Sequence, residues 1–408
     1  MTFSARMRSI RCLDRLQNAL AVRVLGPAAP SRRSIVAPSM AAADGEAGGQ
    51  GAAEFGERRV LSIQSHVVSG YVGNKAATLP LQLLGFDVDP VMSVQFSNHT
   101  GYPTVRGKAF DGDHLRELLQ GLEANGLIRH SHLLTGYMGT VSILEAVAAV
   151  ARALRAANPG LTYVCDPVLG DEGKCYVSEE LIGAYKSTIL PLASILTPNQ
   201  FEAELLTGRP ITDEASALAA CAALHGAGPH TVIITSMDAA DEAARQGGAA
   251  SAEQGSEASS GGGAAPAAGR FITLVASTAR EQLPGRPAAF RVRIPRRDAY
   301  FTGTGDLLAA LLLAWTARHP GDLATAVEKA VGGLQGVLAV TAAAAEAEGR
   351  RGGAAVAEGG GGGAALSSRA GSSAAAFRAK ELRLVQAQGV LVAPLVELRA
   401  EPLAHAAE

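Results

Sequence analysis

The chain is 408 residues long and nearly neutral, with 36 Lys and Arg side chains against 38 Asp and Glu and a formal net charge of −2. A domain that binds nucleic acid usually has a clear basic excess or patch, so this balance argues against DNA and RNA as partners. No continuous apolar run approaches the ~18 to 20 residues of a membrane span, and we therefore expect no membrane segment.

The first 57 residues differ in composition from the rest, and we expect them to be a targeting presequence and disordered leader. Residues 1–43 are rich in arginine, lack lysine and contain one acidic residue, Asp14. Apolar residues between Phe3 and Leu20 recur near helical spacing, which is typical of an amphipathic presequence for a plastid or a mitochondrion. A plain disordered leader is the alternative. A second start at Met40 would give a cytoplasmic product.

From Val60 onward, apolar strand-like runs alternate with helical patterns such as 114–125 and 141–158. Clear strand-like runs are 60–63, 162–165 and 231–234. This alternation predicts one α/β domain over residues 58–341, a three-layer α/β/α sandwich around a mostly parallel central sheet.

Two stretches interrupt the pattern, residues 239–269 and 342–376, because they consist mainly of Ala, Gly, Ser and Glu. We expect both to be low-complexity surface insertions that bury too little apolar surface to fold. A hairpin is expected between them, pairing 271–276 with 289–294. Residues 377–408 are expected to supply the last strands of the domain, at 381–385 and 395–398, and a tail.

Polar side chains follow several of the predicted strands. These residues are Ser65, Asp166, Thr197, Thr235 and Ser236. Ligands of parallel α/β sheets bind beyond the carboxyl ends of the strands, so we expect these residues to meet in one crevice.

A glycine-rich turn, Gly303-Thr304-Gly305-Asp306, leads into an apolar helix at 307–315. Glycines allow a tight turn with exposed N–H groups, and the first turn of a helix adds unpaired donors and a positive dipole end. The turn therefore predicts a phosphate site with Asp306 beside it as a general base. An ordinary capped helix is the alternative.

No GxxxxGK[ST] motif is present, so we do not expect a P-loop kinase. A phosphoryl-transfer enzyme of another kind still needs a phosphate cradle, a cation and a base. The turn at 303–305, the carboxylates of Asp166, Asp171 and Glu202, and Asp306 are the candidates for these three parts.

Six motifs match one family in order, and with them the chain resembles the pyridoxal kinases of the ribokinase superfamily. The motifs are Ser62–Asn74, Ser93–Tyr102, Leu134–Tyr137, Cys165–Asp171, Thr197–Glu204 and Gly303–Asp306. The resemblance covers nearly all of residues 58–341 and extends to 381–401. It is strongest to the plant form and implies a ribokinase-like fold.

The resemblance implies a role for particular residues. Ser65, Thr100 and Tyr137 match the contacts to the pyridoxal ring. Asp166, Asn199, Glu202, Thr235, Ser236, Thr302 and Gly303 match the ATP site, and Asp171–Tyr176 matches the flap over the nucleotide, with Tyr176 at its end. Asp171 and Glu202 match the Mg²⁺ region, while Asp166, Thr197 and Thr235 match a site for a monovalent cation, K⁺ or Na⁺. Asp306 matches the catalytic base, supported by Gly303, Thr304 and Gly305.

The resemblance thus implies transfer of the ATP γ-phosphoryl group to the 5′-hydroxyl of pyridoxal, and also of pyridoxine and pyridoxamine, by a homodimer. Two other functions stay open: a hydroxymethylpyrimidine kinase of thiamin synthesis, and a non-catalytic protein that binds these vitamers. At single positions the alternatives are core packing for Tyr137 and a solvated helix face for Glu202.

Overall fold

The computed structural model describes residues 58–171, 173–237, 271–297, 299, 301–358 and 376–403. These residues belong to one compact unit, residues 55–408. The expected presequence at 1–57 and the insertion at 239–269 lie outside the described residues, as do residues 359–375 of the second low-complexity stretch.

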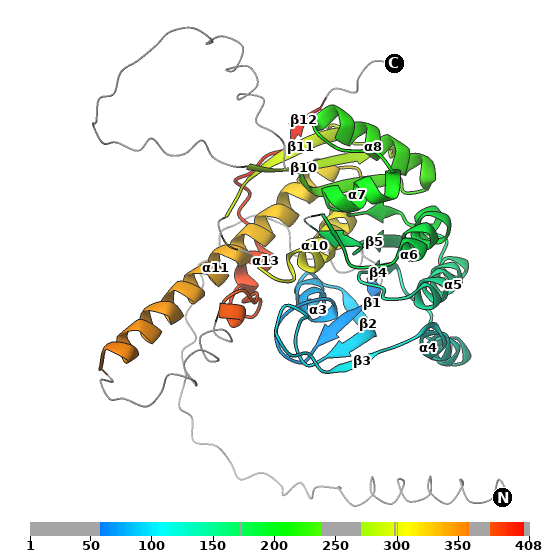
Figure 1. Cartoon of the computed structure of the whole chain (residues 1–408). Helices are drawn as coiled ribbons and strands as arrows, with labels where there is room; N and C mark the ends of the chain where they lie inside the picture. The colour runs from blue at the N-terminus through cyan, green and yellow to red at the C-terminus, as the bar shows by residue number, and fades with distance from the viewer. Residues whose placement is uncertain are drawn as a thin grey trace, which may run out of the picture. The chain divides into compact units, whose positions relative to one another are not determined.

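The described residues form a central sheet of ten strands, in the order β12-β11-β10-β9-β8-β5-β4-β1-β2-β3 (Figure 1). The strands are β1 (Arg59–Val67), β2 (Asp87–Phe96), β3 (Gly107–Ala109), β4 (His132–Thr135), β5 (Thr162–Cys165), β8 (Ile195–Leu196), β9 (Thr231–Met237), β10 (Phe271–Thr278), β11 (Ala289–Pro295) and β12 (Glu401–Pro402). The strands from β9 through β2 pair in parallel, and the pairs at the two edges are antiparallel. The expected hairpin is present as the antiparallel pair of β10 and β11.

Helices cover both faces of the sheet, which gives the three layers that the strand and helix alternation predicts. One face carries α3 (Asn74–Leu83), α10 (Thr304–Arg318), α11 (Leu323–Glu358) and α13 (Gln388–Val392). The other carries α4 (Gly112–Ala124), α5 (Val141–Ala157), α6 (Glu179–Ala184), the π-helical turn Tyr185–Ile189 with the short 3₁₀ turn Leu190–Leu192, α7 (Gln200–Thr207) and α8 (Glu214–Ala227).

Side-chain caps start several of these helices at the positions that their sequences favour. Asp111 accepts the N–H of His114 at the start of α4, and Thr140 accepts the N–H of Ile143 at the start of α5. The strands between the helices are continuous apolar runs, as in β5, because both faces of a parallel sheet are buried.

Helix α11 corrects one expected boundary, since it continues through the first part of the second low-complexity stretch and ends at Glu358. Alanine has the highest helix propensity, so an alanine-rich stretch can extend a helix without burying much surface. The ion pair between Glu346 and Arg350, four residues apart, supports that extension.

The expected strands at 381–385 and 395–398 are wrong, because these segments are irregular and only Glu381 forms an isolated bridge, with Thr302. Leu382 and Leu384 are fully buried among the helices of one face. Their alternating pattern resembles a strand, but it arises because an irregular segment packs against helices. The last strand of the chain is the short β12.

Helix α11 is also long and apolar enough, over Leu323–Glu348, to cross a membrane by length and composition. The count of continuous apolar residues missed it, because small and charged residues interrupt the run. Val327, Val331 and Val337 of this helix are buried in the core that it shares with α10, which is the packing of a core helix.

Candidate active site

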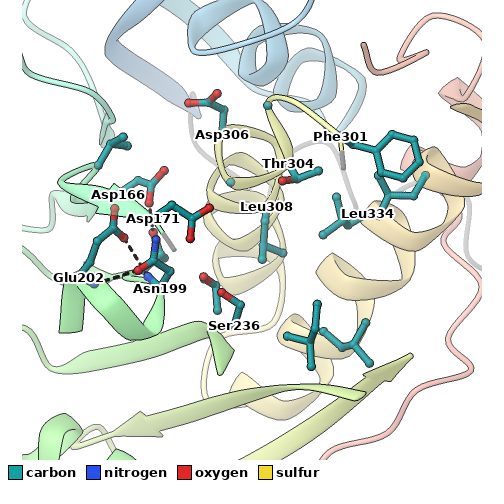
Figure 2. Close-up of a pocket in the computed structure, with 18 of the residues that line it drawn as sticks. Asp166, Asp171, Asn199, Glu202, Ser236, Phe301, Thr304, Asp306, Leu308 and Leu334 are labelled. Carbon is teal, nitrogen blue, oxygen red and sulfur yellow. Dashed lines mark hydrogen bonds between the residues drawn. The ribbon is translucent and has the colours of Figure 1, made fainter. Parts of the chain in front are cut away.

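A pocket of about 400 Å³ lies beyond the carboxyl ends of β5, β8 and β9, where α10 begins (Figure 2). The predicted residues that line it are Asp166, Asp171, Tyr176, Thr197, Asn199, Glu202, Thr235, Ser236, Gly303, Thr304, Gly305 and Asp306. Of the strand-end residues expected to meet in one crevice, Asp166, Thr197, Thr235 and Ser236 line this pocket and Ser65 does not, and the glycine turn borders it. Thr302, which was also expected at the ATP site, does not line the pocket. It donates its N–H to the carbonyl oxygen of Lys380 at 3.1 Å.

Asp166 follows β5 and is 7% exposed. The hydroxyl of Thr197, which follows the neighbouring strand β8, donates to Asp166 Oδ1 at 3.2 Å. Burial raises the pKa of Asp166 to about 8, and the charge of Asp306 adds to the rise. A cation bound beside Asp166 would offset this cost, because a nearby opposite charge favours the ionised carboxylate.

Glu202, in the first turn of α7, is 5% exposed and has both carboxylate oxygens in hydrogen bonds. Its Oε1 accepts the N–H of Leu169 at 2.9 Å and that of Gly170 at 3.5 Å. Its Oε2 accepts the N–H of Asn199 at 2.9 Å. The Asn199 Oδ1 in turn accepts the backbone N–H of Glu202, and the two bonds form a capping box. Glu202 thus fastens the turn after β5 to the start of α7, and it is not on a solvated helix face.

The glycine turn is held against a loop that follows β1. Gly303 has φ 87°, which favours glycine, and a Cβ there would collide with the carbonyl oxygen of Tyr71. Gly305 and Asp306 occupy the first turn of α10. The backbone N–H groups of this turn lack partners within the helix and lie at the end that borders the pocket.

The side chain of Asp306 extends toward the blue ribbon that follows β1 in the chain (Figure 2), and its charge also acts on Asp166. Its carboxylate accepts the backbone N–H of Gly73. Burial raises the pKa of Asp306, and the bond from Gly73 opposes that rise. Asp306 therefore lies at the wall between the pocket and the loop after β1.

The residues expected to bind the acceptor, Ser65, Thr100 and Tyr137, do not line the pocket. Gly73 packs so closely on Ser65 that a Cβ would collide with its Oγ. Tyr137 follows β4 and Ser65 lies in β1, each two residues past the paired positions Thr135 and Ile63, so the two residues extend from adjacent parallel strands.

Thr100 is exposed in the loop between β2 and β3. That loop begins directly after Phe96, the residue that pairs with Val67 at the end of β1. Thr100 therefore belongs to the same edge of the sheet as Ser65, but the structure gives it no contact with that residue.

The segment expected to be a flap forms a two-stranded hairpin, β6 (Gly170–Asp171) with β7 (Lys174–Cys175). Gly173 at its tip has φ 75°. Tyr176, just after the hairpin, lines the pocket and is 52% exposed. The hairpin thus borders the pocket on the side of Asp171.

The sequence did not identify the apolar wall of the pocket. Its residues are Ile272, Ile294, Phe301, Leu308, Leu334 and Leu338. They come from β10, β11, the loop before α10, α10 and α11, and each one reads as an ordinary core residue in the sequence. An apolar slot beside a polar, phosphate-binding end suits a flat aromatic base carrying a phosphate chain.

The carboxylates offer oxygen ligands, the type that Mg²⁺ prefers. Asp166 and Asp171 line the pocket together, and Thr197 adds a hydroxyl on Asp166. Within the described residues, no group of three or more His, Cys, Asp or Glu side chains is arranged to enclose a metal. This donor set fits an ion that shares its ligands with a substrate's phosphates.

Comparison with known proteins gives consistent relatives. A family model described as phosphomethylpyrimidine kinase matches residues 128–256. The pyridoxal kinase of Arabidopsis thaliana is 50% identical over 280 residues, which are 69% of this chain and 81% of that protein. The pyridoxal kinase of Homo sapiens is 45% identical over 302 residues, 72% of this chain and 89% of that protein. The structure of pyridoxal kinase from Leishmania donovani with ADP and pyridoxamine is similar with a TM-score of 0.64 at 33% identity, over 85% of this chain and all of that one.

Proposed function

The chain belongs to the pyridoxal kinase family, and from that premise we propose how its residues phosphorylate the vitamer. It is an ATP-dependent kinase with a ribokinase-like fold that converts pyridoxal to pyridoxal 5′-phosphate. In the proposed arrangement the pocket takes the nucleotide, with the base in the apolar wall and the phosphates at the glycine turn. Ser65, Thr100 and Tyr137 take the acceptor.

The contacts of Gly73 support this arrangement most strongly. Gly73 packs against Ser65, and its backbone N–H lowers the pKa of Asp306, a residue that lines the nucleotide pocket. The acceptor's 5′-hydroxyl gives its proton to Asp306 as its oxygen bonds to the γ-phosphorus, and the bond from that phosphorus to the β–γ bridging oxygen of ATP breaks. The N–H groups of Gly303, Thr304 and Gly305 stabilise the charge on the transferring phosphoryl group.

We propose that Asp171 and Asp166 hold Mg²⁺, and that Asp166, Thr197 and Thr235 hold K⁺ or Na⁺. Bound Mg²⁺ would neutralise phosphate charge during transfer. The elevated pKa of Asp166 supports this proposal, because a buried carboxylate without a counter-charge gains most from a cation. A chelated, salt-exchanged protein should need both Mg²⁺ and K⁺ added back for full turnover, and full turnover in their absence would remove the proposal.

For Glu202 we propose a positioning role in place of direct metal ligation, because its two oxygens already accept backbone N–H groups. Glu202→Gln turns one acceptor into a donor that faces an N–H group, so we expect a loss of about 1 to 3 kcal/mol in unfolding free energy. The Mg²⁺ concentration for half-maximal activity should not change. Exposed Glu180→Gln is the matched control. An unchanged melting temperature with a raised Mg²⁺ requirement would instead make Glu202 a ligand.

Hydroxymethylpyrimidine phosphorylation is the second candidate, because the matching family model carries a pyrimidine kinase description. That match covers residues 128–256 and therefore leaves out Ser65, Thr100 and the glycine turn. It says little about which acceptor the site prefers. Separate assays with pyridoxal, pyridoxine, pyridoxamine and hydroxymethylpyrimidine test the assignment. Turnover of the pyrimidine alone would overturn it, and binding of pyridoxal without any turnover would favour a vitamer-binding protein.

Two further points are proposals based on resemblance and composition. We propose that the chain forms a homodimer, which sedimentation of the full chain tests. We also propose that residues 1–57 direct the protein to a plastid or a mitochondrion, with a cytoplasmic product from Met40. A fluorescent fusion of residues 1–57 that stays in the cytoplasm would remove the targeting role.

A further inference from the structure

A C-terminal segment that the mechanism does not use contacts both sides of the active site. We name it the C-terminal strap, residues 377–385. It contacts the acceptor loop, residues 97–104, and also the residue that precedes the glycine turn. None of the strap's residues lines the nucleotide pocket. The side chain of Glu381, which is 8% exposed, contacts both the acceptor loop and the loop after β1.

The first contact is with the acceptor loop. The hydroxyl of Tyr102 donates to Glu381 Oε1 at 2.8 Å, across 279 residues of sequence. The Tyr102 ring also packs on Phe377 of the strap, with ring centroids 4.9 Å apart, and on His99 at 4.7 Å. A hydrogen bond to a buried carboxylate is stronger than one between neutral groups, so this bond orders the loop that carries Thr100.

The second contact is with the loop after β1. A Cβ added to Gly70 would lie 2.9 Å from Glu381 Oε1, so the Glu381 carboxylate packs closely against Gly70. The same loop packs Tyr71 on Gly303 and donates the Gly73 N–H to Asp306. Glu381 is therefore packed behind the loop that fixes the catalytic carboxylate.

The third contact is with the glycine turn itself. Thr302, the residue before Gly303, forms a parallel bridge with Glu381 and donates its N–H to the carbonyl oxygen of Lys380 at 3.1 Å. The backbone of the strap and the side chain of Glu381 thus reach three separate segments of the site.

From these contacts we propose that Glu381 is a positioning residue that locks the acceptor loop, the loop after β1 and the glycine turn into one arrangement. The inference rests on the proposed function, since it assigns these segments to the acceptor and the catalytic base. Loss of the Glu381 carboxylate should loosen the acceptor loop and weaken pyridoxal binding. No residue of the strap lines the nucleotide pocket, so ADP binding should stay nearly unchanged.

The test compares Glu381→Ala, Glu381→Gln, Tyr102→Phe and the Ala/Phe double variant of the full chain. We expect Glu381→Ala to lower kcat/KM for pyridoxal by about 10- to 100-fold, the range of a hydrogen bond to a charged group. Glu381→Gln keeps an acceptor for the Tyr102 hydroxyl and should recover most of that loss. The double variant should be little worse than Glu381→Ala, because the two single changes remove the same bond.

Arg383→Ala is the matched control on the strap, because it removes an ion pair with Glu348 on α11 and leaves the loops untouched. Equal losses of pyridoxal and ADP binding in Glu381→Ala, together with a lower melting temperature, would indicate a merely structural role and overturn the proposal. Wild-type kinetics in Glu381→Ala would overturn it as well.

Calorimetric binding of pyridoxal separates this proposal from the proposed function. An inactive wild type that binds pyridoxal about tenfold more tightly than Glu381→Ala would keep the positioning role and remove the kinase assignment. An active wild type whose pyridoxal affinity is the same as that of Glu381→Ala would keep the kinase and remove the positioning role.

Discussion

Replacing Asp306 by asparagine is the most informative change to the proposed catalytic machinery. Asparagine has almost the same shape, and its Oδ1 can still accept the N–H of Gly73 that the Asp306 carboxylate accepts. The loop after β1 and the glycine turn should therefore keep their positions. The side chain loses its charge and its ability to take a proton from the acceptor hydroxyl.

A positioned general base contributes about 10²- to 10⁴-fold to a rate, so Asp306→Asn should lower kcat by that factor. This corresponds to about 2.7 to 5.4 kcal/mol in activation free energy. The KM for ATP should change little, because Asn199 and Ser236, which the resemblance assigns to the nucleotide, lie away from Asp306 in the pocket (Figure 2). The assay is a steady-state measurement of ADP and pyridoxal phosphate formation with each substrate varied in turn.

Stability gives an independent check on the same variant. Burial raises the pKa of Asp306, so its ionised form is unfavourable in the fold at neutral pH, and the neutral amide should leave the melting temperature unchanged or higher. Exposed Asp113→Asn is the matched control. A kcat within about threefold of wild type, in a protein that melts normally, would refute the role of Asp306 as the base.

Two further predictions concern the glycine turn and the pH dependence. Gly303→Ala should abolish most activity and lower the melting temperature, because a Cβ collides with Tyr71. Gly285 has a similar φ of 79° and open space around it, so Gly285→Ala should lose only about 1 to 2 kcal/mol in unfolding free energy. Equal losses of stability in both variants would contradict the collision. Burial raises the pKa values of Asp166 and Asp306, so kcat/KM should rise with pH through a limb above the usual aspartate range. Added Mg²⁺ favours the ionised carboxylates and should move that limb to lower pH, and a limb near pH 4 at every Mg²⁺ concentration would speak against it.

Most of the fold could be predicted from the sequence, because the parallel sheet leaves a simple pattern. The run Thr162–Cys165, buried from its second residue on, is strand β5 with the same bounds. The helix pattern at 141–158 is α5, whose cap Thr140 precedes it. These elements depend on local periodicity and local capping, which a single sequence displays directly.

The C-terminal part could not be predicted in the same way. Leu382 and Leu384 alternate like strand residues, yet they pack on helices, and nothing local distinguishes the two kinds of burial. The sequence also does not show that α11 extends to Glu358. The low-complexity composition of this stretch predicts no folded core, but its alanines favour a helix.

The candidate site likewise has a part that local sequence patterns predict and a part that depends on tertiary packing. Strand-end residues such as Asp166 and Thr197 could be placed together, because parallel strands bring their carboxyl ends to one edge. The bond between Tyr102 and Glu381 joins positions far apart in sequence, and the apolar wall uses residues such as Leu334 that look like any core leucine. Such contacts depend on tertiary packing, which a single sequence does not display.

The most direct test of the account is a competition assay on the full chain, with ATP, Mg²⁺ and K⁺ and equal concentrations of pyridoxal and hydroxymethylpyrimidine. The ratio of the two phosphorylated products gives the ratio of their kcat/KM values. The account predicts that pyridoxal 5′-phosphate is the main product and that Asp306→Asn removes it. Preferential phosphorylation of the pyrimidine, or undiminished pyridoxal phosphate formation by Asp306→Asn, would contradict it.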